Sequence, residues 1–126
     1  MKLIKVDPKL EELYTIHRFI HEIIQKEDFE VRLITEEIFV NIIKYSDADY
    51  IKISADFNNK TQLLSLEFID NGVKFNPLEK EDHVAPDNIE ETEIGGLGIH
   101  FVTNLADSIK YNYDTENHLI ITKKVK

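Results

Sequence analysis

The sequence predicts an α+β fold in which helices cover one face of an antiparallel sheet. Two segments, about 8–26 and 29–45, carry apolar residues at helical spacing. Two later segments, 50–57 and 62–69, alternate apolar and polar residues as the strands of a β-hairpin do. The chain has 126 residues, which is long enough to bury one hydrophobic core and too short for two. We therefore expect one domain over residues 1–126.

The composition is typical of a soluble globular protein and argues against several other classes. Hydrophobic residues make up 42% of the chain and charged residues 31%. No apolar run has the length of a membrane span, and Asp7-Pro8 interrupts the start too soon for a signal peptide. The lack of cysteine excludes disulfides and thiolate metal sites and fits a cytoplasmic protein. The formal net charge of −9 argues against binding to nucleic acid.

The first half of the chain is expected to hold a short strand and two helices. Residues 2–6 are expected to form the strand, and Asp7 and Pro8 are typical of a helix N-cap and first turn. The apolar side of this first helix is expected to contain Leu10, Leu13, Tyr14, His17, Ile20 and Ile24. The second helix is expected over 29–45.

The hairpin strands predict which side of the sheet is covered. Two apolar rows are expected on the buried side: Ile51, Ile53, Ala55 and Phe57 in the first strand, and Leu64, Leu66 and Phe68 in the second. Asp70 is the next residue in the second row, so its carboxylate should point into the helical layer. A buried carboxylate needs a hydrogen-bond donor. Asp70 is therefore a candidate binding residue, and the alternative is that Asp70-Asn71-Gly72 only forms a turn.

The second helix carries a polar strip with apolar residues on both sides. At about 100° per residue, Glu30, Glu37, Asn41 and Lys44 lie within about 60° of one another. A solvated face should instead lie opposite the core, which suits Glu36, about 100° away from Glu37. We interpret Glu37 and Asn41 as a carboxylate and a carboxamide that point into a shared cavity. The alternative is an ordinary surface pair one helical turn apart.

The rest of the chain is expected to contain a loop, a helix and two strands. Residues 73–94 include two prolines and seven acidic residues without periodicity, which predicts a mobile loop. A helix is expected over about 96–106, and strands over 108–113 and 118–124 should complete the sheet.

Three of the chain's four glycines, Gly95, Gly96 and Gly98, stand at the start of that last helix. The first N–H groups of a helix and the helix dipole can hold an anion without any basic side chain. The spacing fits neither a Walker A loop nor a dinucleotide-binding fingerprint. These glycines are therefore candidates for contacts with phosphate.

Three polar motifs follow one another along the chain: Glu37-x-x-x-Asn41, Asp70-x-Gly72 and Gly96-x-Gly98. In this order they resemble the N, G1 and G2 boxes of the GHKL superfamily of ATPases, which includes gyrase, heat-shock chaperones, histidine kinases and mismatch-repair proteins. The segments "DNGVKFNPLE" and "GGLGIHFVTNLADSIKY" are similar to those of the small bacterial anti-sigma-factor serine/threonine kinases. The resemblance extends from about residue 8 to the end of the chain.

The resemblance implies a fold and a nucleotide. The fold would be an α+β two-layer sandwich with helices on one face of a mixed, mostly antiparallel sheet, the Bergerat-type ATP-binding fold. ATP and Mg²⁺ would bind between the helices and the loop, and residues 73–94 would form a lid over the ATP.

The resemblance also implies a role for each motif residue. Asn41 would ligate Mg²⁺, and Asp70 would accept a hydrogen bond from the adenine amino group. Gly72 would let the backbone turn under the base. The phosphates would be met by Gly96, Leu97 and Gly98. Glu37 would be the general base that takes the proton from an attacking serine hydroxyl.

The implied activity is ATP-dependent phosphorylation of a small regulatory protein similar to an anti-sigma-factor antagonist. The resemblance also allows a sigma factor as a second partner, and a homodimer. One alternative is a non-catalytic ATP-binding module that binds a partner protein in a nucleotide-dependent way and does not need Glu37. Another is a histidine-kinase catalytic domain on its own. The sequence leaves open whether Lys44, Lys74 or Lys80 contacts phosphate.

Overall fold

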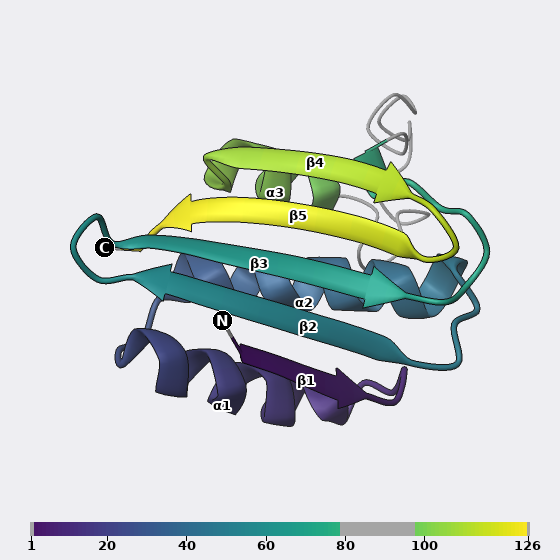
Figure 1. Ribbon diagram of the computed structural model, residues 1–126, viewed down its shortest axis with the longest axis horizontal. Coiled ribbons are helices and arrows are strands. Elements are labelled where there is room, and N and C mark those ends of the chain that lie inside the picture. Colours follow the sequence, from purple (N-terminus) through teal and green to yellow (C-terminus); the bar gives the residue numbers. More distant parts are fainter. Residues whose placement is uncertain (1, 79–97, 126) are drawn as a thin grey trace, which may run out of the picture.

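The computed structural model describes residues 2–78 and 98–125. These residues form two layers, a five-stranded sheet and three helices on one of its faces (Figure 1). The elements are β1 (Lys2–Val6), α1 (Glu12–Ile24), α2 (Phe29–Tyr45), β2 (Ile51–Asn58), β3 (Leu63–Asp70), α3 (Gly98–Leu105), β4 (Ser108–Tyr113) and β5 (Asn117–Lys124). The α+β two-layer arrangement is therefore confirmed. None of the described helices has the length and apolar character needed to cross a membrane.

The strands lie in the order β1-β2-β3-β5-β4, and each described pairing is antiparallel. The predicted hairpin is formed by β2 and β3, in which Ile51 pairs with Asp70 and Asn58 with Leu63. Because β5 lies between β3 and β4, Asp70 also pairs with Asn117 across the β3–β5 ladder. This register places two polar side chains next to each other at one end of the sheet.

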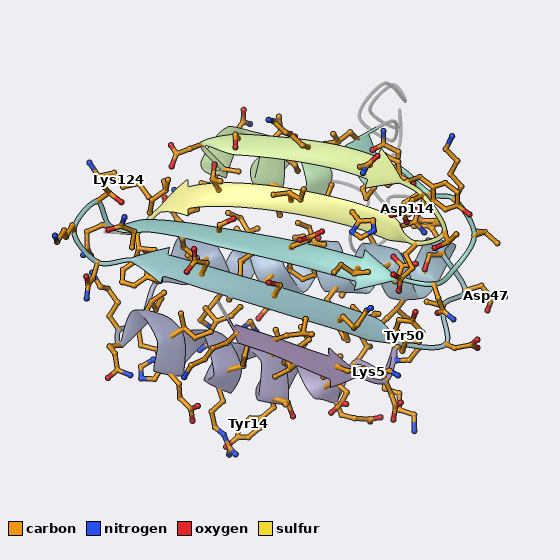
Figure 2. All side chains as sticks on the ribbon, in the orientation of Figure 1. Lys5, Tyr14, Asp47, Tyr50, Asp114 and Lys124 are labelled. Carbon is orange, nitrogen blue, oxygen red and sulfur yellow. The ribbon has the colours of Figure 1, made fainter. Side chains whose placement is uncertain are left out.

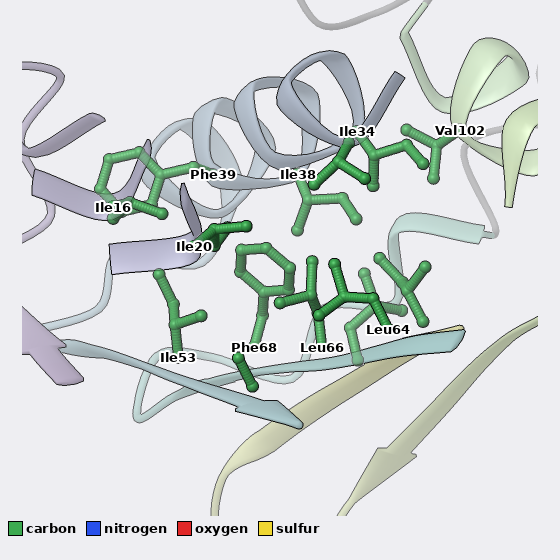
Figure 3. Packing of buried hydrophobic residues seen from close by; sticks show 14 of the residues in the cluster. Ile16, Ile20, Ile34, Ile38, Phe39, Ile53, Leu64, Leu66, Phe68 and Val102 are labelled. Atoms are coloured by element: carbon green, nitrogen blue, oxygen red, sulfur yellow. The ribbon is translucent and has the colours of Figure 1, made fainter. Parts of the chain in front are cut away.

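The core lies between the sheet and the helices, as the alternation in the hairpin strands predicted. Ile53, Leu66 and Phe68 point from the sheet toward Ile38 and Phe39 of α2 (Figure 3), and all five side chains are buried. Burying a side chain of this size contributes about 1.5–3 kcal/mol to folding. The core therefore fixes α2 on the sheet and so determines where the polar residues of α2 lie.

The second helix spans the predicted residues and begins at a side-chain cap. The carboxylate of Asp28 accepts a hydrogen bond from the N–H of Val31 at 2.9 Å. This bond satisfies one of the free N–H groups of the first helical turn. The cap and the buried residues of α2 together explain why local sequence was sufficient to place this helix.

The first helix begins later than predicted, and part of its predicted buried side is wrong. Asp7 is not its N-cap, because α1 starts at Glu12; the N–H of Asp7 instead donates to the Glu12 carboxylate at 3.2 Å. The fully buried residues of α1 are Ile16, Ile20 and Ile24. Tyr14, which was expected on the buried side, is 71% exposed and projects away from the sheet (Figure 2).

Candidate functional site

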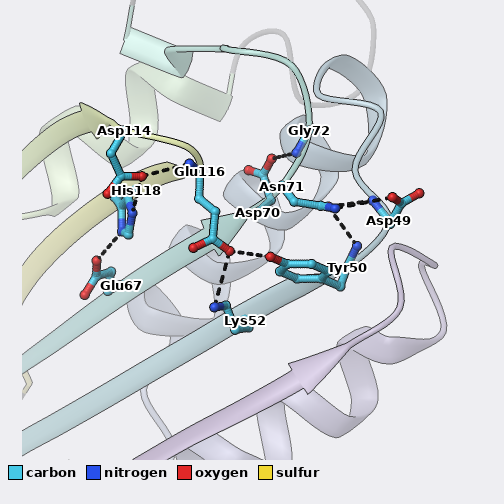
Figure 4. Close-up of polar contacts among 10 residues, drawn as sticks. All are labelled: Asp49, Tyr50, Lys52, Glu67, Asp70, Asn71, Gly72, Asp114, Glu116 and His118. Atoms are coloured by element: carbon cyan, nitrogen blue, oxygen red, sulfur yellow. Dashed lines mark hydrogen bonds and ion pairs between the residues drawn. The ribbon is translucent and has the colours of Figure 1, made fainter.

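Asp70 ends β3 with its carboxylate buried, only 2% exposed. Its Oδ1 atom accepts hydrogen bonds from the N–H of Gly72 at 2.9 Å (Figure 4) and from Nδ2 of Asn117 at 3.0 Å. No described residue donates to Oδ2. The bond to Gly72 is a local turn contact, but the bond to Asn117 comes from a different strand. One oxygen of Asp70 is therefore held by the protein, and the other can accept a hydrogen bond from a ligand.

Position 72 requires glycine because the backbone there lies too close to Ser46 to leave space for a side chain. A Cβ atom at this position would lie 2.1 Å from the backbone oxygen of Ser46, which is the residue after α2. The same Ser46 oxygen accepts the N–H of Val73 at 2.7 Å. The glycine thus allows the end of β3 to contact the end of α2, and no unusual backbone angle is needed to explain it.

Two further contacts hold the segment after β3 against α2. The ring of Phe75 lies 5.3 Å, centroid to centroid, from the ring of Tyr45 in the last turn of α2. The side-chain oxygen of Asn71 accepts the N–H groups of Asp49 at 2.8 Å and Tyr50 at 3.3 Å (Figure 4). These contacts bring the carboxyl end of β3 and the carboxyl end of α2 to one place.

Asn41 lies on α2 near this junction and is 1% exposed. It precedes Ser46 by five residues, or about 7.5 Å along the helix axis. Its Nδ2 atom donates to the backbone oxygen of Glu37 at 2.7 Å. Because the nitrogen makes this bond, Oδ1 is the side-chain atom that would ligate a cation, and an amide oxygen suits a hard cation such as Mg²⁺.

Glu37 lies one helical turn before Asn41 and is half-buried. Its Oε2 atom is shielded from solvent and has no hydrogen-bond partner among the described residues. Burial raises the pKa of Glu37, the nearby charge of Glu36 raises it further, and the charge of Lys44 acts in the opposite direction. A shielded carboxylate oxygen without a donor is costly. Glu37 is therefore the described side chain that most clearly needs a ligand or a proton.

Glu30, the first residue of the predicted polar strip, does not join this site. Glu30 forms an ion pair with Lys123 of β5, with 2.6 Å between Oε1 and Nζ. Lys44 is exposed, and its Nζ lies 6.0 Å from the centre of the Tyr45 ring. Glu36 points to the other side of α2, where its carboxylate lies 3.0 Å from Nε2 of His17. The shared cavity of Glu37 and Asn41 stays a prediction, and Glu30 belongs to an ion pair with β5 instead.

Several predicted site residues lie outside the described part of the chain. Gly96, Leu97 and Lys80 are among them, as are residues 79–94 of the predicted lid. Gly98 is the first residue of α3. That helix packs along α2 and leads into β4 at the end of the sheet away from Asp70, so it begins toward the end where Asp70 lies (Figure 1). Lys74 lies beside the ring of Tyr113, with 5.7 Å between its Nζ and the ring centre.

Asn117 was not among the predicted site residues, although the sequence contained a signal for it. Asn117 is 3% exposed and ends the inward-facing row of β5 that includes Leu119 and Ile121. It occupies the same kind of position as Asp70, a polar residue at the end of a buried apolar row. That comparison was sufficient to single out Asp70 and would have singled out Asn117 had the strand been predicted one residue longer.

The donor set fits a nucleotide with a cation better than a metal held by protein alone. Among the described residues, no group of three or more acidic or histidine side chains could hold a metal ion. Mg²⁺ typically takes one or two protein ligands and completes its shell with phosphate oxygens and water. Asn41 as a single ligand beside the unpartnered Glu37 oxygen fits that pattern, and the second oxygen of Asp70, to which no described residue donates, fits a base with an amino group.

Comparisons with known proteins identify a matching family and several relatives. Residues 6–123 match the family described as Histidine kinase-like ATPase domain. Curated relatives include the serine-protein kinase RsbW of Listeria monocytogenes serotype 4a and of Listeria innocua serovar 6a, which are 24% and 23% identical over 102 residues. These alignments cover 76% of this chain and 65% of each relative, so the chain spans less than two thirds of their length.

A solved structure is similar over the whole chain. The histidine kinase AdeS of Acinetobacter baumannii matches with a TM-score of 0.54 and 16% identity, covering 100% of this chain and 68% of that one. At this identity the likeness concerns the fold alone. It agrees with the two-layer arrangement described above.

Proposed function

The chain belongs to the histidine kinase-like ATPase domain family, and from this premise we propose that it is an ATP-dependent serine/threonine protein kinase of the anti-sigma-factor type. Membership of an ATPase domain family implies ATP binding. The proposed substrate is a small regulatory protein similar to an anti-sigma-factor antagonist. The printed name of the Listeria relatives, serine-protein kinase, supports this reaction class. A sigma factor as a second partner, a homodimer and a cytoplasmic location stay predictions.

In this proposal the nucleotide binds where β3 meets α2. Asp70 accepts the adenine amino group through Oδ2, because Oδ1 is already occupied by two donors from the protein. Gly72 allows the backbone to lie against Ser46, and it is proposed to let the backbone turn under the base. Asn41 is the protein ligand of Mg²⁺, which would neutralise charge on the phosphates. Gly96, Leu97 and Gly98 are proposed to meet the phosphates through their backbone N–H groups.

The observation that carries the kinase proposal is the shielded, unpartnered Oε2 atom of Glu37. A general base needs an oxygen that is not already hydrogen-bonded and a pKa closer to neutral than that of an exposed carboxylate. Glu37 meets both conditions, because burial and Glu36 raise its pKa. It also lies about 6 Å along the helix from the proposed cation ligand Asn41. A module that only binds ATP has no need of such a carboxylate.

The proposed step uses Glu37 as the proton acceptor. The serine hydroxyl of the partner protein gives its proton to Oε2 of Glu37 while its oxygen forms a bond to the γ-phosphorus of ATP. The bond between that phosphorus and the bridging oxygen to the β-phosphate breaks, and ADP leaves with the electron pair. In this step the chain holds ATP and the serine of the partner protein in position, and it accepts the proton.

The test is phosphate transfer from γ-labelled ATP to candidate regulatory proteins, followed by chemical identification of the labelled residue. Glu37→Gln keeps the shape of the side chain and removes the proton acceptor, so the transfer rate should fall by about 10²–10⁴-fold. ATP affinity should change little. Glu30→Gln is the matched control, because Glu30 lies on the same helix but pairs with Lys123 of β5. It should transfer phosphate at nearly the wild-type rate.

Three results would contradict the proposal in different ways. A wild-type rate for Glu37→Gln would mean that Glu37 is not the base. Acid-labile label would indicate phosphohistidine and would contradict serine specificity. A partner that binds only in the presence of ATP and is never labelled would favour the non-catalytic module.

A further inference from the structure

The side chain of Asn117 uses its full hydrogen-bonding capacity at the junction of β3, β4 and β5. Its Nδ2 atom donates to Oδ1 of Asp70 at 3.0 Å and to the backbone oxygen of Val73 at 2.8 Å. Its Oδ1 atom accepts the N–H of Phe75 at 2.9 Å and the hydroxyl of Tyr111. An asparagine side chain offers two N–H donors and two acceptor lone pairs, so all four are occupied here.

These partners leave only one orientation for the Asn117 amide. The N–H of Phe75 can only donate, and the backbone oxygen of Val73 can only accept. A flipped amide would face a donor with its nitrogen and an acceptor with its oxygen, which breaks both bonds. The donor that faces Asp70 is therefore fixed by two backbone groups, and buried networks that are fully satisfied in this way are rigid.

We infer that Asn117 is a positioning residue for base selectivity: it holds the Asp70 carboxylate so that Oδ2 faces the base, and it couples this orientation to residues 73–75, the first residues of the predicted lid. The inference rests on the proposed ATP site. It assigns Asn117 no contact with the nucleotide. Its effect passes through Asp70 on one side and through the backbone of Val73 and Phe75 on the other.

The physical reason is that one donor alone does not fix a carboxylate. Without Asn117, Oδ1 of Asp70 would keep only the N–H of Gly72, which lies two residues away on the same turn. The carboxylate could then rotate, and either oxygen could turn toward Gly72. With Asn117 present, Oδ1 has a donor from the next strand as well, and rotation would break a buried hydrogen bond. Selectivity for an amino group depends on an acceptor that does not move away from it.

The test compares ATP with purine riboside triphosphate, which lacks the 6-amino group and is otherwise the same ligand. Wild-type protein should prefer ATP by about tenfold or more, the difference expected for one buried hydrogen bond to a charged acceptor. Asn117→Ala should reduce this preference to about threefold or less and should change the affinity for purine riboside triphosphate far less. Asn112→Ala is the matched control, since Asn112 is exposed on the neighbouring strand β4. It should keep the wild-type ratio.

A purely structural role for Asn117 would lower both affinities together and leave the ratio unchanged, which would overturn the inference. If Asn117→Ala does not fold, Asn117→Ser replaces it, because one hydroxyl can donate to Asp70 or to Val73 but not to both. For that variant, the ratio of ATP affinity to purine riboside triphosphate affinity should be greater than 1 and smaller than the wild-type ratio. A wild-type ratio there would also overturn the inference.

The experiment distinguishes failure of the proposed ATP site from failure of the inference about Asn117. If wild-type protein binds neither nucleotide, the proposed ATP site is wrong and the inference about base selectivity is wrong with it. If wild type discriminates and both Asn117 variants discriminate equally well, the ATP site stands and only the inference is wrong. The coupling to the segment after β3 has its own measurement: amide hydrogen exchange at Phe75 should be faster in Asn117→Ala than in wild type.

Discussion

Gly72 lies so close to Ser46 that no side chain fits between them: a Cβ at position 72 would stand 2.1 Å from the Ser46 backbone oxygen. The contact joins the residue after α2 to the turn after β3, and the hydrogen bond from Val73 to the same oxygen accompanies it. Through this contact the helix that carries Asn41 and the strand that carries Asp70 have one fixed relation. The predicted adenine acceptor and the predicted cation ligand depend on it equally.

Gly72→Ala should therefore destabilise the fold and weaken ATP binding. Forcing a methyl group into a packed contact typically costs about 1–3 kcal/mol, and a urea titration should show a loss of this size. The double variant Gly72→Ala, Ser46→Ala should be no more stable than Gly72→Ala, because the nearest atom is the Ser46 backbone oxygen and not its hydroxyl. Full rescue by the second substitution would show that the hydroxyl, at 2.6 Å, is the obstacle instead.

Asp70→Asn should shift the base preference of the site from adenine toward guanine. Two donors face Oδ1 of Asp70, so an asparagine would keep its oxygen there and place its nitrogen where Oδ2 was. That nitrogen would meet the adenine amino group donor to donor, and ATP affinity should fall by about 1–3 kcal/mol. Guanine presents an acceptor at the same position, so GTP should gain relative to ATP.

Calorimetry with ATP and GTP measures this exchange. Asp49→Asn is a suitable control, because it removes the same charge from an exposed carboxylate in the loop after α2. Its ratio of ATP to GTP affinity should equal that of wild type. An unchanged ratio in Asp70→Asn would contradict the proposed reading of adenine by Asp70.

Local sequence was sufficient for the elements whose determinants are local. The periodicity of residues 29–45 predicted α2 with its observed bounds, and alternation predicted the β2–β3 hairpin within one residue. It was not sufficient for the start of α1. Asp7-Pro8 resembles a helix start in the sequence, but their backbone groups are satisfied in a separate turn, with the Asp7 oxygen accepting the N–H of Lys9.

Within the site, the sequence predicted the direction in which a side chain points better than it predicted the residue that the side chain contacts. It placed Asp70 correctly at the end of a buried row, but the donor to Asp70 is Asn117, a residue 47 positions away. It also placed Glu30 on the strip of Glu37 correctly by angle, yet only the position of β5 reveals that Glu30 faces Lys123. Contacts between distant segments depend on how the layers pack. The roles of Glu37, Asn41 and the glycines stay predictions.

Asn41→Ala should make nucleotide binding insensitive to Mg²⁺. Wild-type affinity for ATP should be higher with Mg²⁺ than with a chelator, and the variant should show about the same affinity in both conditions, since its cation ligand is gone. Thr35→Ala is the matched control. Thr35 is buried on the same helix and its hydroxyl donates to the carbonyl four residues earlier at 2.8 Å, as the Asn41 amide does. A Mg²⁺ response in Asn41→Ala equal to that of Thr35→Ala would exclude Asn41 as the ligand.

His118 should make the stability of the fold depend on pH. It lies on the open face of the sheet, where Nδ1 is 2.7 Å from Glu67 and Nε2 is 3.2 Å from Asp114 (Figure 4). Burial by itself would lower the pKa of His118, but the hydrogen bond with Glu67 and the charge of Asp114 outweigh burial and raise it. The folded protein therefore binds this proton more tightly than the unfolded chain does.

The sign of the effect follows from linkage. Stabilisation by protonated His118 should be fully present below the ordinary histidine pKa of about 6.5 and should be lost as the pH rises through the raised pKa of the folded state. Urea unfolding of wild type and His118→Gln over this interval isolates the contribution, because the free-energy difference between the two proteins removes the titration of other groups. That difference should shrink as the pH rises, and the His118 ring should titrate above about 6.5 by NMR. A difference that grows with pH, or a ring that titrates below the ordinary value, would mean that burial outweighs the two carboxylates.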